Sequence, residues 1–365
     1  MSISPTFPVG LHLLQAVLLA GLIIGATGGV SARDRGVPGA ACWQRPAPET
    51  LEEAFITSGK NRARQAQVEQ RPASNAVLLL SNGLLKVAYS AGLIVGWGET
   101  GERPRFAAIT AVGTSALIAP FAFIGTAGDQ AIADIFNCDA GSLDALAENA
   151  ASFLDEGVLA AIAREHDAGR RLVVALPGSA IRPETIWDIG LISKSRDPAA
   201  LALVKDILRA STGKRVSVEP SAALKETMQI APPNPAFRHP GTGREFLPPA
   251  RFMLLADGRM RYFLVHNDSL YWDESADYIA SRKNSPARDD SAPALLPGSD
   301  IVQRAVAARA SFRFASPKTA GGLTPQSEFD RAYLKGLFHH AFRQARMDKE
   351  WGPEFPGLKL GASGR

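Results

Sequence analysis

Short apolar runs that end in turn-forming residues alternate with longer helical segments through the middle of the chain. Three runs have the length and boundaries of a buried strand: 75–81, 106–110 and 171–176. Helical patterns follow them at 86–100, 116–124, 142–167 and 198–210. The third pattern is one or two helices, because Asp155-Glu156-Gly157 interrupts it. Because strands that alternate with helices form parallel sheets, this order predicts an α/β layered fold with a mostly parallel central sheet.

The remainder of the chain is less regular. Residues 232–249 are rich in Pro, Gly and Arg, which predicts a loop. From about residue 250 we expect a hairpin, with arms at 252–255 and 260–265 joined by a turn at Asp257-Gly258. Two closing helices are predicted at 300–310 and 329–349.

The amino terminus has the pattern of an export signal. No charged residue precedes Arg33, and residues 11–26 are strongly apolar. This run is shorter than the ~20 residues that a bilayer-spanning helix needs. Val30, Ser31 and Ala32 fit a small-x-small cleavage signal. We therefore expect residues 1–32 to be a signal peptide, with an uncleaved N-terminal anchor as the alternative, and the protein to be exported to the periplasm or envelope.

Residues 33–73 mix Arg, Pro, Gly and Gln, which predicts an exposed leader before the folded domain. Cys42 follows three small residues, so lipidation of Cys42 is a further alternative. The second cysteine is Cys138, and two cysteines are too few for a disulfide framework or a zinc cluster. A single Cys42–Cys138 disulfide and a free, buried Cys138 are both open, and the second is the simpler expectation.

Composition narrows the classes of function. Hydrophobic residues make up 46% of the chain and charged residues 21%, which is enough to build a sizeable core. The net charge is only +4, and no run of Lys and Arg is interleaved with aromatic residues. Nucleic acid is therefore not an expected partner. No metal and no cofactor are expected either.

Several stretches of this chain are similar in amino-acid sequence to one bacterial enzyme family. Residues 91–106, AGLIVGWGETGERPRF, resemble a segment of the bacterial patatin-like phospholipases. Residues 186–190 and 197–201 fit the middle strand and helix of that family, and 329–334 fit its closing helix. The resemblance implies a three-layer α/β/α patatin-like sandwich over residues 74–356. It also implies the family's activity, acyl-lipid hydrolysis by a Ser-Asp dyad.

The family's chemistry requires a glycine-rich oxyanion loop, G-G-G-x-[KR]-G, because the developing oxyanion needs preorganised donors. That loop falls on residues 82–87, NGLLKV, in which Gly83 and Lys86 match. Residues 82–87 are thus the predicted remnant of this loop, and Asn82 is its first residue. Leu84 and Val87 replace glycines, which let the backbone approach a ligand closely or adopt a positive φ.

Both dyad positions also depart from the family. In the elbow, G-x-S-x-G, the first glycine falls on Ala111, the serine on Gly113 and the last glycine on Ser115. The aspartate of the D-G-[GA] motif falls on Ala231, which is followed by prolines. A serine hydroxyl is a poor nucleophile without an adjacent base. The sequence therefore predicts that Gly113 and Ala231 are vestigial catalytic positions.

These departures lead to a functional expectation with two alternatives. We expect a catalytically inactive, patatin-like pseudoenzyme that binds a phospholipid, an acyl group or a protein partner, with a membrane surface as a further candidate. The first alternative is a serine lipid acyl hydrolase that uses Ser115 as its nucleophile, whereas a capping role for Ser115 at the start of the next helix is the simpler expectation. The second alternative is a structural envelope protein.

Overall fold

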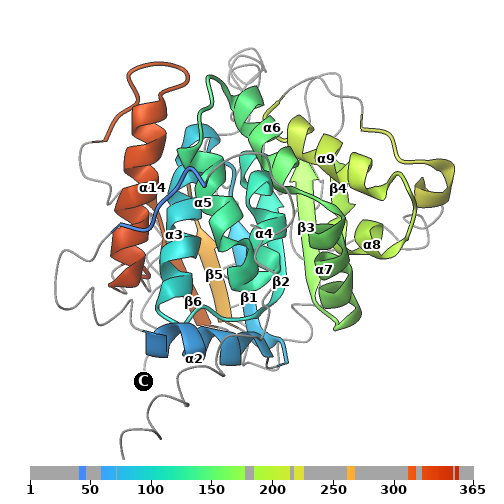
Figure 1. Cartoon of the computed structure of the whole chain (residues 1–365), viewed down its shortest axis with the longest axis horizontal. Coiled ribbons are helices and arrows are strands. Elements are labelled where there is room, and N and C mark those ends of the chain that lie inside the picture. The colour runs from blue at the N-terminus through green and yellow to red at the C-terminus, as the bar shows by residue number, and fades with distance from the viewer. Residues whose placement is uncertain are drawn as a thin grey trace, which may run out of the picture. The chain divides into compact units, whose positions relative to one another are not determined.

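The computed structural model describes residues 41–46, 59–70, 72–176, 185–213, 218–225, 261–267, 311–317, 323–347 and 350–352. The chain divides into two compact units, Met1–Gly39 and Ala40–Arg365, and every described residue belongs to the second. Within it, six strands form one sheet in the order β4-β3-β2-β1-β5-β6 (Figure 1). All neighbouring strands are parallel except β3 and β4. The predicted α/β class with a mostly parallel sheet is confirmed.

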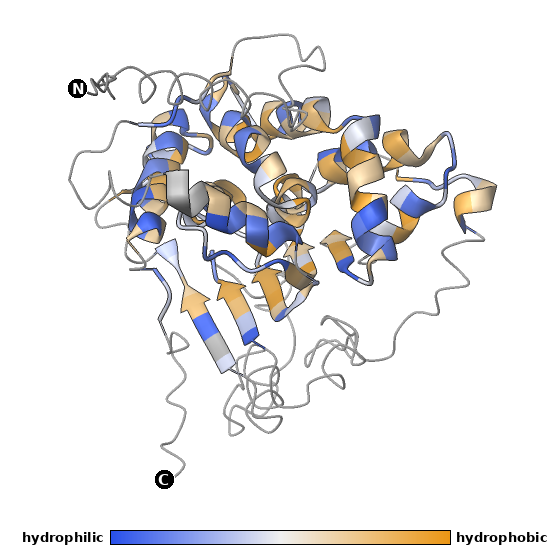
Figure 2. Cartoon of the chain, turned by 60° about the horizontal axis from the view of Figure 1, so that its bottom comes forward, coloured by the Kyte–Doolittle hydropathy of each residue, from blue (hydrophilic) through white to orange (hydrophobic). Residues whose placement is uncertain are grey.

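The strands match the apolar runs of the sequence. They are β1 (Ser74–Leu80), β2 (Phe106–Val112), β3 (Arg171–Leu176), β4 (Thr185–Asp188), β5 (Arg261–Val265) and β6 (Ser311–Ala315). The last five residues of β1 are all buried. Because successive side chains of a strand point to opposite faces, both faces of β1 are covered. Figure 2 shows the apolar character of the strands.

The helices that follow β1 and β2 lie across one face of the sheet (Figure 1). The described helices are α2 (Gly59–Gln70), α3 (Val87–Glu99), α4 (Ala119–Phe123), α5 (Asp129–Asn137), α6 (Leu143–Phe153), α7 (Glu156–Asp167), α8 (Ile189–Lys194), α9 (Ala200–Ala210) and α14 (Arg331–Arg346). Three short 3-10 turns are η2 (Leu84–Lys86), η3 (Gly113–Leu117) and η4 (Gly125–Gly128). The expected break in the helical region 142–167 is confirmed: α6 ends at Phe153, and the Asp155 carboxylate accepts the N–H of Val158 at 2.8 Å and so caps α7. Within the described ranges, none of the helices combines the length and apolarity needed to cross a bilayer.

Two glycines allow α14 to pack closely on α3. A Cβ at Gly92 would lie 2.0 Å from the carbonyl oxygen of Phe338, and one at Gly96 would lie 2.3 Å from that of Phe342. These distances leave no room for any side chain at either position. The small residues of the predicted helix 86–100 therefore serve helix packing, and α3 is buried along its whole length.

The structure describes only parts of the expected exposed leader, 33–73, and in these parts most side chains are exposed or half-buried, whereas Trp43 and Gln65 are buried. Trp43 is only 6% exposed, and its ring packs edge-on against Phe338 and Phe342 of α14. Residues 59–70 form α2, in which Gln65 is buried. The burial of Trp43 is favourable because an indole buries a large apolar area when it packs on a helix.

The cysteines form a disulfide between Cys42 and Cys138, across a sequence separation of 96 residues. The expectation of a free, buried Cys138 is therefore wrong. The Cys42 sulfur is bonded to another cysteine, so the lipidation alternative does not fit this structure either. The bond ties the segment around Trp43 to the end of α5.

The predicted hairpin is also wrong in its pairing. β5 lies between β1 and β6 and is parallel to both, so neither edge is available for an antiparallel arm along Arg261–Val265. The proposed first arm, 252–255, lies outside the described residues. So do the signal segment 1–32, the loop 232–249 and the helix 300–310.

Candidate functional site

The candidate site lies beside β1, at the point where the order in which strands are added to the sheet changes direction. From β1 the chain adds β2 and β3 on one side, and β5 is added later on the other side. In open α/β sheets, ligands bind outside the carboxyl ends of the strands at this switch point. The residues that follow β1 here are Asn82, Gly83 and Lys86, and those that follow β2 are Gly113 and Ser115. Hydrogen bonds and close contacts between the two loops show that the structure brings them together, whereas Ala231 lies outside the described residues.

Gly113, at the nucleophile position of the resemblance, is the first residue of η3. Its φ is +53°, in the left-handed region that side chains disfavour. A Cβ there would lie 2.5 Å from Oδ1 and 2.7 Å from Cγ of Asn82. The Asn82 side chain therefore occupies the space into which a residue with a side chain would extend.

Asn82 is held in that place by the turn after β2. Its Oδ1 accepts hydrogen bonds from the backbone N–H and from the hydroxyl of Thr114, both at 3.2 Å. The Thr114 hydroxyl also lies 3.3 Å from the carbonyl oxygen of Leu84, and Thr114 is fully buried. Asn82, Gly113 and Thr114 thus form one interlocked contact between the β1 and β2 loops.

Ser115 is completely buried, and its hydroxyl donates to the carbonyl oxygen of Ser81 at 2.6 Å. Its oxygen also accepts from Nδ2 of Asn267 at 3.3 Å. The expected capping role is wrong, because η3 has no side-chain cap and this hydroxyl bonds to another strand's loop. A carbonyl and an amide do not take up a proton near neutral pH, so these partners provide no general base for Ser115.

Asn267, two residues after β5, was not found by sequence reasoning. Its backbone N–H donates to the Ser81 hydroxyl at 2.9 Å, and its Nδ2 donates to the Ser81 carbonyl at 2.9 Å. Its Oδ1 accepts from the hydroxyl of Ser90 on α3 at 2.8 Å. The signal was a polar pair, His266-Asn267, directly after an apolar run. Its importance depends on β5 pairing with β1, which the hairpin expectation did not predict.

The segment expected to be the remnant of an oxyanion loop, residues 82–87, contains the 3-10 turn η2. The N–H of Lys86 donates to the carbonyl of Gly83 at 2.8 Å, and a Cβ at Gly83 would lie 2.3 Å from Cβ of Asn267. Leu84 keeps a positive φ, +46°, although it carries a side chain, and it is 55% exposed. The loop therefore presents an apolar side chain at its apex, while Gly83 packs against the β5 end.

In the described part of the chain, one group of side chains has metal-ligand spacing: Cys42, Asp134 and Cys138. The two sulfurs are bonded to each other, so neither is a thiolate ligand. The Asp134 carboxylate accepts a hydrogen bond from the backbone N–H of Trp43 at 2.8 Å and another from Nε2 of Gln130 at 3.1 Å. This group therefore fastens the amino-terminal segment to α5.

No family model matches the chain, and neither a curated protein nor a solved structure matches it. The resemblance to patatin-like phospholipases thus rests on the residues quoted above. The chemistry of the site rests on its geometry, in which Asn, Ser and Thr side chains hydrogen-bond to one another and to the backbone, and two glycines lie in close contact with Asn side chains.

Proposed function

We propose that this chain is an exported, non-hydrolytic member of the patatin-like group that works by binding acyl lipid. The observation that carries the proposal is the pair Gly113 and Asn82. The nucleophile position is a glycine, and the space beside it is filled by an amide that is bonded to Thr114. A serine cannot replace Gly113 unless Asn82 moves.

The arrangement of the loops supports the family assignment, including its three-layer sandwich. In the family's chemistry the oxyanion loop and the elbow act on the same substrate, so the two loops must lie together. Here the loop with Gly83 follows β1, and the turn with Gly113 follows β2, the parallel neighbour of β1. Burial of both faces of β1 is the pattern of a central strand in a layered fold.

The disulfide supports export. Disulfides form and persist in oxidising compartments and are rare where thiols are kept reduced. The Cys42–Cys138 bond lies ten residues or more beyond the end of the proposed signal segment, 1–32, so cleavage there leaves it intact.

Leu84 supports an acyl ligand. An apolar side chain that is 55% exposed, on a residue with positive φ, stands where the family loop approaches its substrate. A left-handed backbone is unfavourable for a residue with a side chain, and residues strained in this way cluster at ligand-binding positions, so Leu84 favours a contact with an apolar ligand. The Ser115 hydrolase alternative lacks such support, because Ser115 is buried and bonded to Ser81.

The first test is hydrolysis of a p-nitrophenyl ester by the full chain and by its Ser115→Ala variant. We expect no release of nitrophenol above the uncatalysed rate from either protein. Hydrolysis by the natural chain that disappears in the variant would contradict the proposal.

The second test is flotation with phospholipid vesicles. Leu84→Asp removes the apolar side chain with a residue that tolerates positive φ. Leu323→Asp is the matched control, because Leu323 is a large apolar side chain that is 41% exposed elsewhere. We expect the Leu84 variant to lose vesicle binding and the Leu323 variant to keep it. Equal behaviour of the two variants, or an unaltered protein that never floats, would overturn lipid binding through Leu84 and leave a protein partner as the ligand to seek.

A further inference from the structure

The disulfide between Cys42 and Cys138 lies against a buried carboxylate, that of Asp134. The two sulfurs and a carboxylate oxygen of Asp134 all lie within 4.8 Å of one another. Cys42 is exposed, Cys138 is half-buried and Asp134 is 5% exposed. Thiolate sulfur and carboxylate oxygen are among the ligands that Zn²⁺ takes in proteins. The group therefore holds three ligand atoms for a thiophilic divalent cation, provided that the two sulfurs are not bonded to each other.

Helix α5 positions two of the three ligands. Asp134 and Cys138 are four residues apart, and the N–H of Cys138 donates to the carbonyl of Asp134 at 2.8 Å. Residues at this spacing lie on the same face of a helix, so the two side chains are neighbours. Their arrangement comes from the backbone hydrogen bond and does not require the disulfide.

The third ligand, Cys42, lies in the segment 41–46, which non-covalent contacts also hold in place. The backbone N–H of Trp43 donates to Oδ1 of Asp134 at 2.8 Å, and Nε2 of Gln130 donates to the carbonyl of Trp43 at 3.2 Å. The Trp43 ring is only 6% exposed, because it packs against aromatic rings of α14. We therefore expect Cys42 to stay beside Asp134 after the S–S bond breaks.

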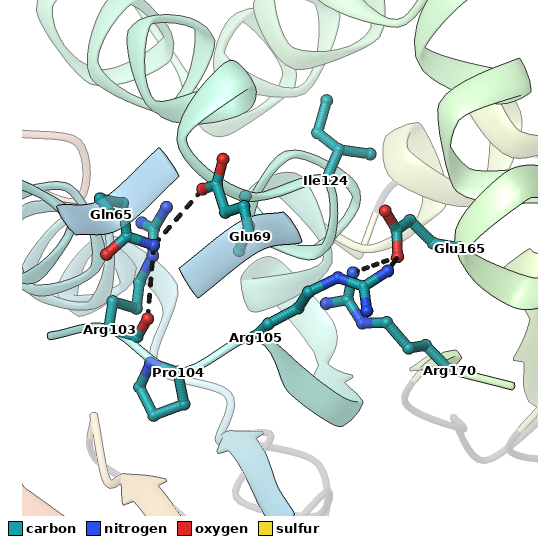
Figure 3. Close-up of a pocket in the computed structure, with 10 residues that line it drawn as sticks. Gln65, Glu69, Arg103, Pro104, Arg105, Ile124, Glu165 and Arg170 are labelled. Atoms are coloured by element: carbon teal, nitrogen blue, oxygen red, sulfur yellow. Dashed lines mark hydrogen bonds and ion pairs between the residues drawn. The ribbon is translucent and has the colours of Figure 1, made fainter. Parts of the chain in front are cut away.

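The partners of the Asp134 carboxylate suit a metal ligand. Its two oxygens accept from neutral N–H groups, one of a backbone amide and one of a side-chain amide. Outer partners of this kind orient a ligating carboxylate. The Glu165 carboxylate is different, because one of its oxygens is bonded to the guanidinium groups of Arg105 and Arg170, as Figure 3 shows. Guanidinium groups repel a metal ion, so Glu165 is a poor ligand and Asp134 a suitable one.

We propose that reduction of the Cys42–Cys138 disulfide converts this group into a Zn²⁺ site, with both thiolates and the Asp134 carboxylate as ligands. Three protein ligands leave the fourth tetrahedral position to water or another small ligand. The disulfide and the bound metal are thus alternative links between the segment 41–46 and α5. The inference goes beyond the proposed function and does not depend on the binding of acyl lipid.

The conversion takes place in two steps. A dithiol gives up two electrons and two protons and becomes a cyclic disulfide, while the protein S–S bond breaks and each sulfur takes one proton. The reductant reaches the sulfur of Cys42 from solvent, because Cys42 is exposed. Zn²⁺ then displaces both thiol protons to solvent, and two bonds form between sulfur and metal.

The test is a titration of the full chain with Zn²⁺, before and after reduction by a phosphine. The phosphine becomes its oxide with oxygen and two protons from water, and it brings no competing thiol. We expect the reduced chain to bind one Zn²⁺ and the oxidised chain to bind none. Co²⁺ in place of Zn²⁺ should give the near-ultraviolet charge-transfer band of thiolate ligands. Absence of stoichiometric Zn²⁺ binding after reduction, or bound Co²⁺ without that band, would overturn the site.

Asp134→Asn tests the carboxylate ligand, because asparagine can still accept the N–H of Trp43. We expect the affinity of the reduced chain for Zn²⁺ to fall by more than about tenfold, since loss of an outer partner alone has an effect of about that size. Asp139→Asn is the matched control. Asp139 follows Cys138 directly, but it is 85% exposed and pairs with Arg331. Equal Zn²⁺ affinities of the two variants would refute the role of Asp134.

Cys42→Ser tests the thiolates, and we expect this variant to bind no stoichiometric Zn²⁺ after the phosphine treatment. Retained binding would refute the role of the cysteines. Circular dichroism of the reduced natural chain without metal should show that it keeps its fold. Loss of the fold at this stage would also contradict the proposal, because the segment 41–46 must stay in place to supply its ligand.

Discussion

The contact between Gly113 and Asn82 can be tested by adding one methyl group. In Gly113→Ala, the new Cβ meets Oδ1 of Asn82 at 2.5 Å, in a backbone with φ of +53°. Two effects then oppose folding, one from the backbone conformation and one from the displaced side chain.

The two effects have separable magnitudes. A non-glycine residue in the left-handed region costs about 1–2 kcal/mol. Displacing Asn82 removes its two hydrogen bonds with Thr114, each worth about 0.5–1.5 kcal/mol. Together they predict that Gly113→Ala lowers the free energy of unfolding by about 2–5 kcal/mol.

The assay is urea unfolding of four proteins in a double-mutant cycle: the natural chain, Gly113→Ala, Asn82→Ala and the double variant. Because both single variants lose the same hydrogen bonds, the double variant should be about 1–3 kcal/mol more stable than the sum of the single losses predicts. Gly169→Ala is the control for the backbone effect alone, since Gly169 has φ of +89° and nothing lies within 4 Å of its Cβ position. Additive losses in the cycle, or equal losses for Gly113→Ala and Gly169→Ala, would refute the reasoning.

Three further predictions concern the rest of the domain. Cys42→Ser should lower the free energy of unfolding by about 2–4 kcal/mol, because the disulfide closes a loop of 96 residues, and a reductant should then destabilise the natural chain but not the variant. Gly92→Ala should lower the free energy of unfolding by about 1–3 kcal/mol, because the new Cβ forces α14 away from α3. Gly336→Ala is the control and should stabilise α14, because its Cβ meets only Leu323, at 3.6 Å. Equal effects of the two variants in thermal unfolding would contradict this packing. Burial raises the pKa of Asp129 from 3.8 to about 6, against the opposing effect of Arg103, so the folded state binds the extra proton. The stability advantage of the natural chain over Asp129→Asn should therefore fall by about 3 kcal/mol as pH rises from about 3 to about 7, and a constant or growing difference would disprove it.

The parts of the fold that local patterns determine could be predicted from the sequence. The runs at 75–81, 106–110 and 171–176 became β1, β2 and β3 within two residues at each end, because continuous apolar runs fit strands that are buried on both faces. The small residues of 86–100 became the closely packed α3. These signals need no knowledge of distant partners.

Features that depend on distant partners could not be predicted. The Asp257-Gly258 signal favoured a local hairpin, whereas β5 pairs with β1 across more than 180 residues, as the hydrogen bond from Asn267 to Ser81 shows. Trp43 lies in a polar segment, and its burial depends on the ring of Phe342 far along the chain.

The candidate site could likewise be predicted from the sequence only in part. The resemblance to a family motif drew attention to Gly113, the predicted vestigial nucleophile position. What fills the space beside it is Asn82, and that depends on the register of β1 against β2. Ser115 had two local interpretations, catalysis and capping, and its bond to Ser81 belongs to neither, because it joins two loops.

The most direct test of the central claim is labelling of the full chain with a fluorophosphonate probe, followed by peptide mapping. A reactive serine requires exposure and a general base, and Ser115 has a buried hydroxyl bonded to a carbonyl. The account predicts that no label is found on the peptide that contains Ser115, in the natural chain or in the Asn82→Ala variant. Stoichiometric label on Ser115 of the natural chain would contradict it.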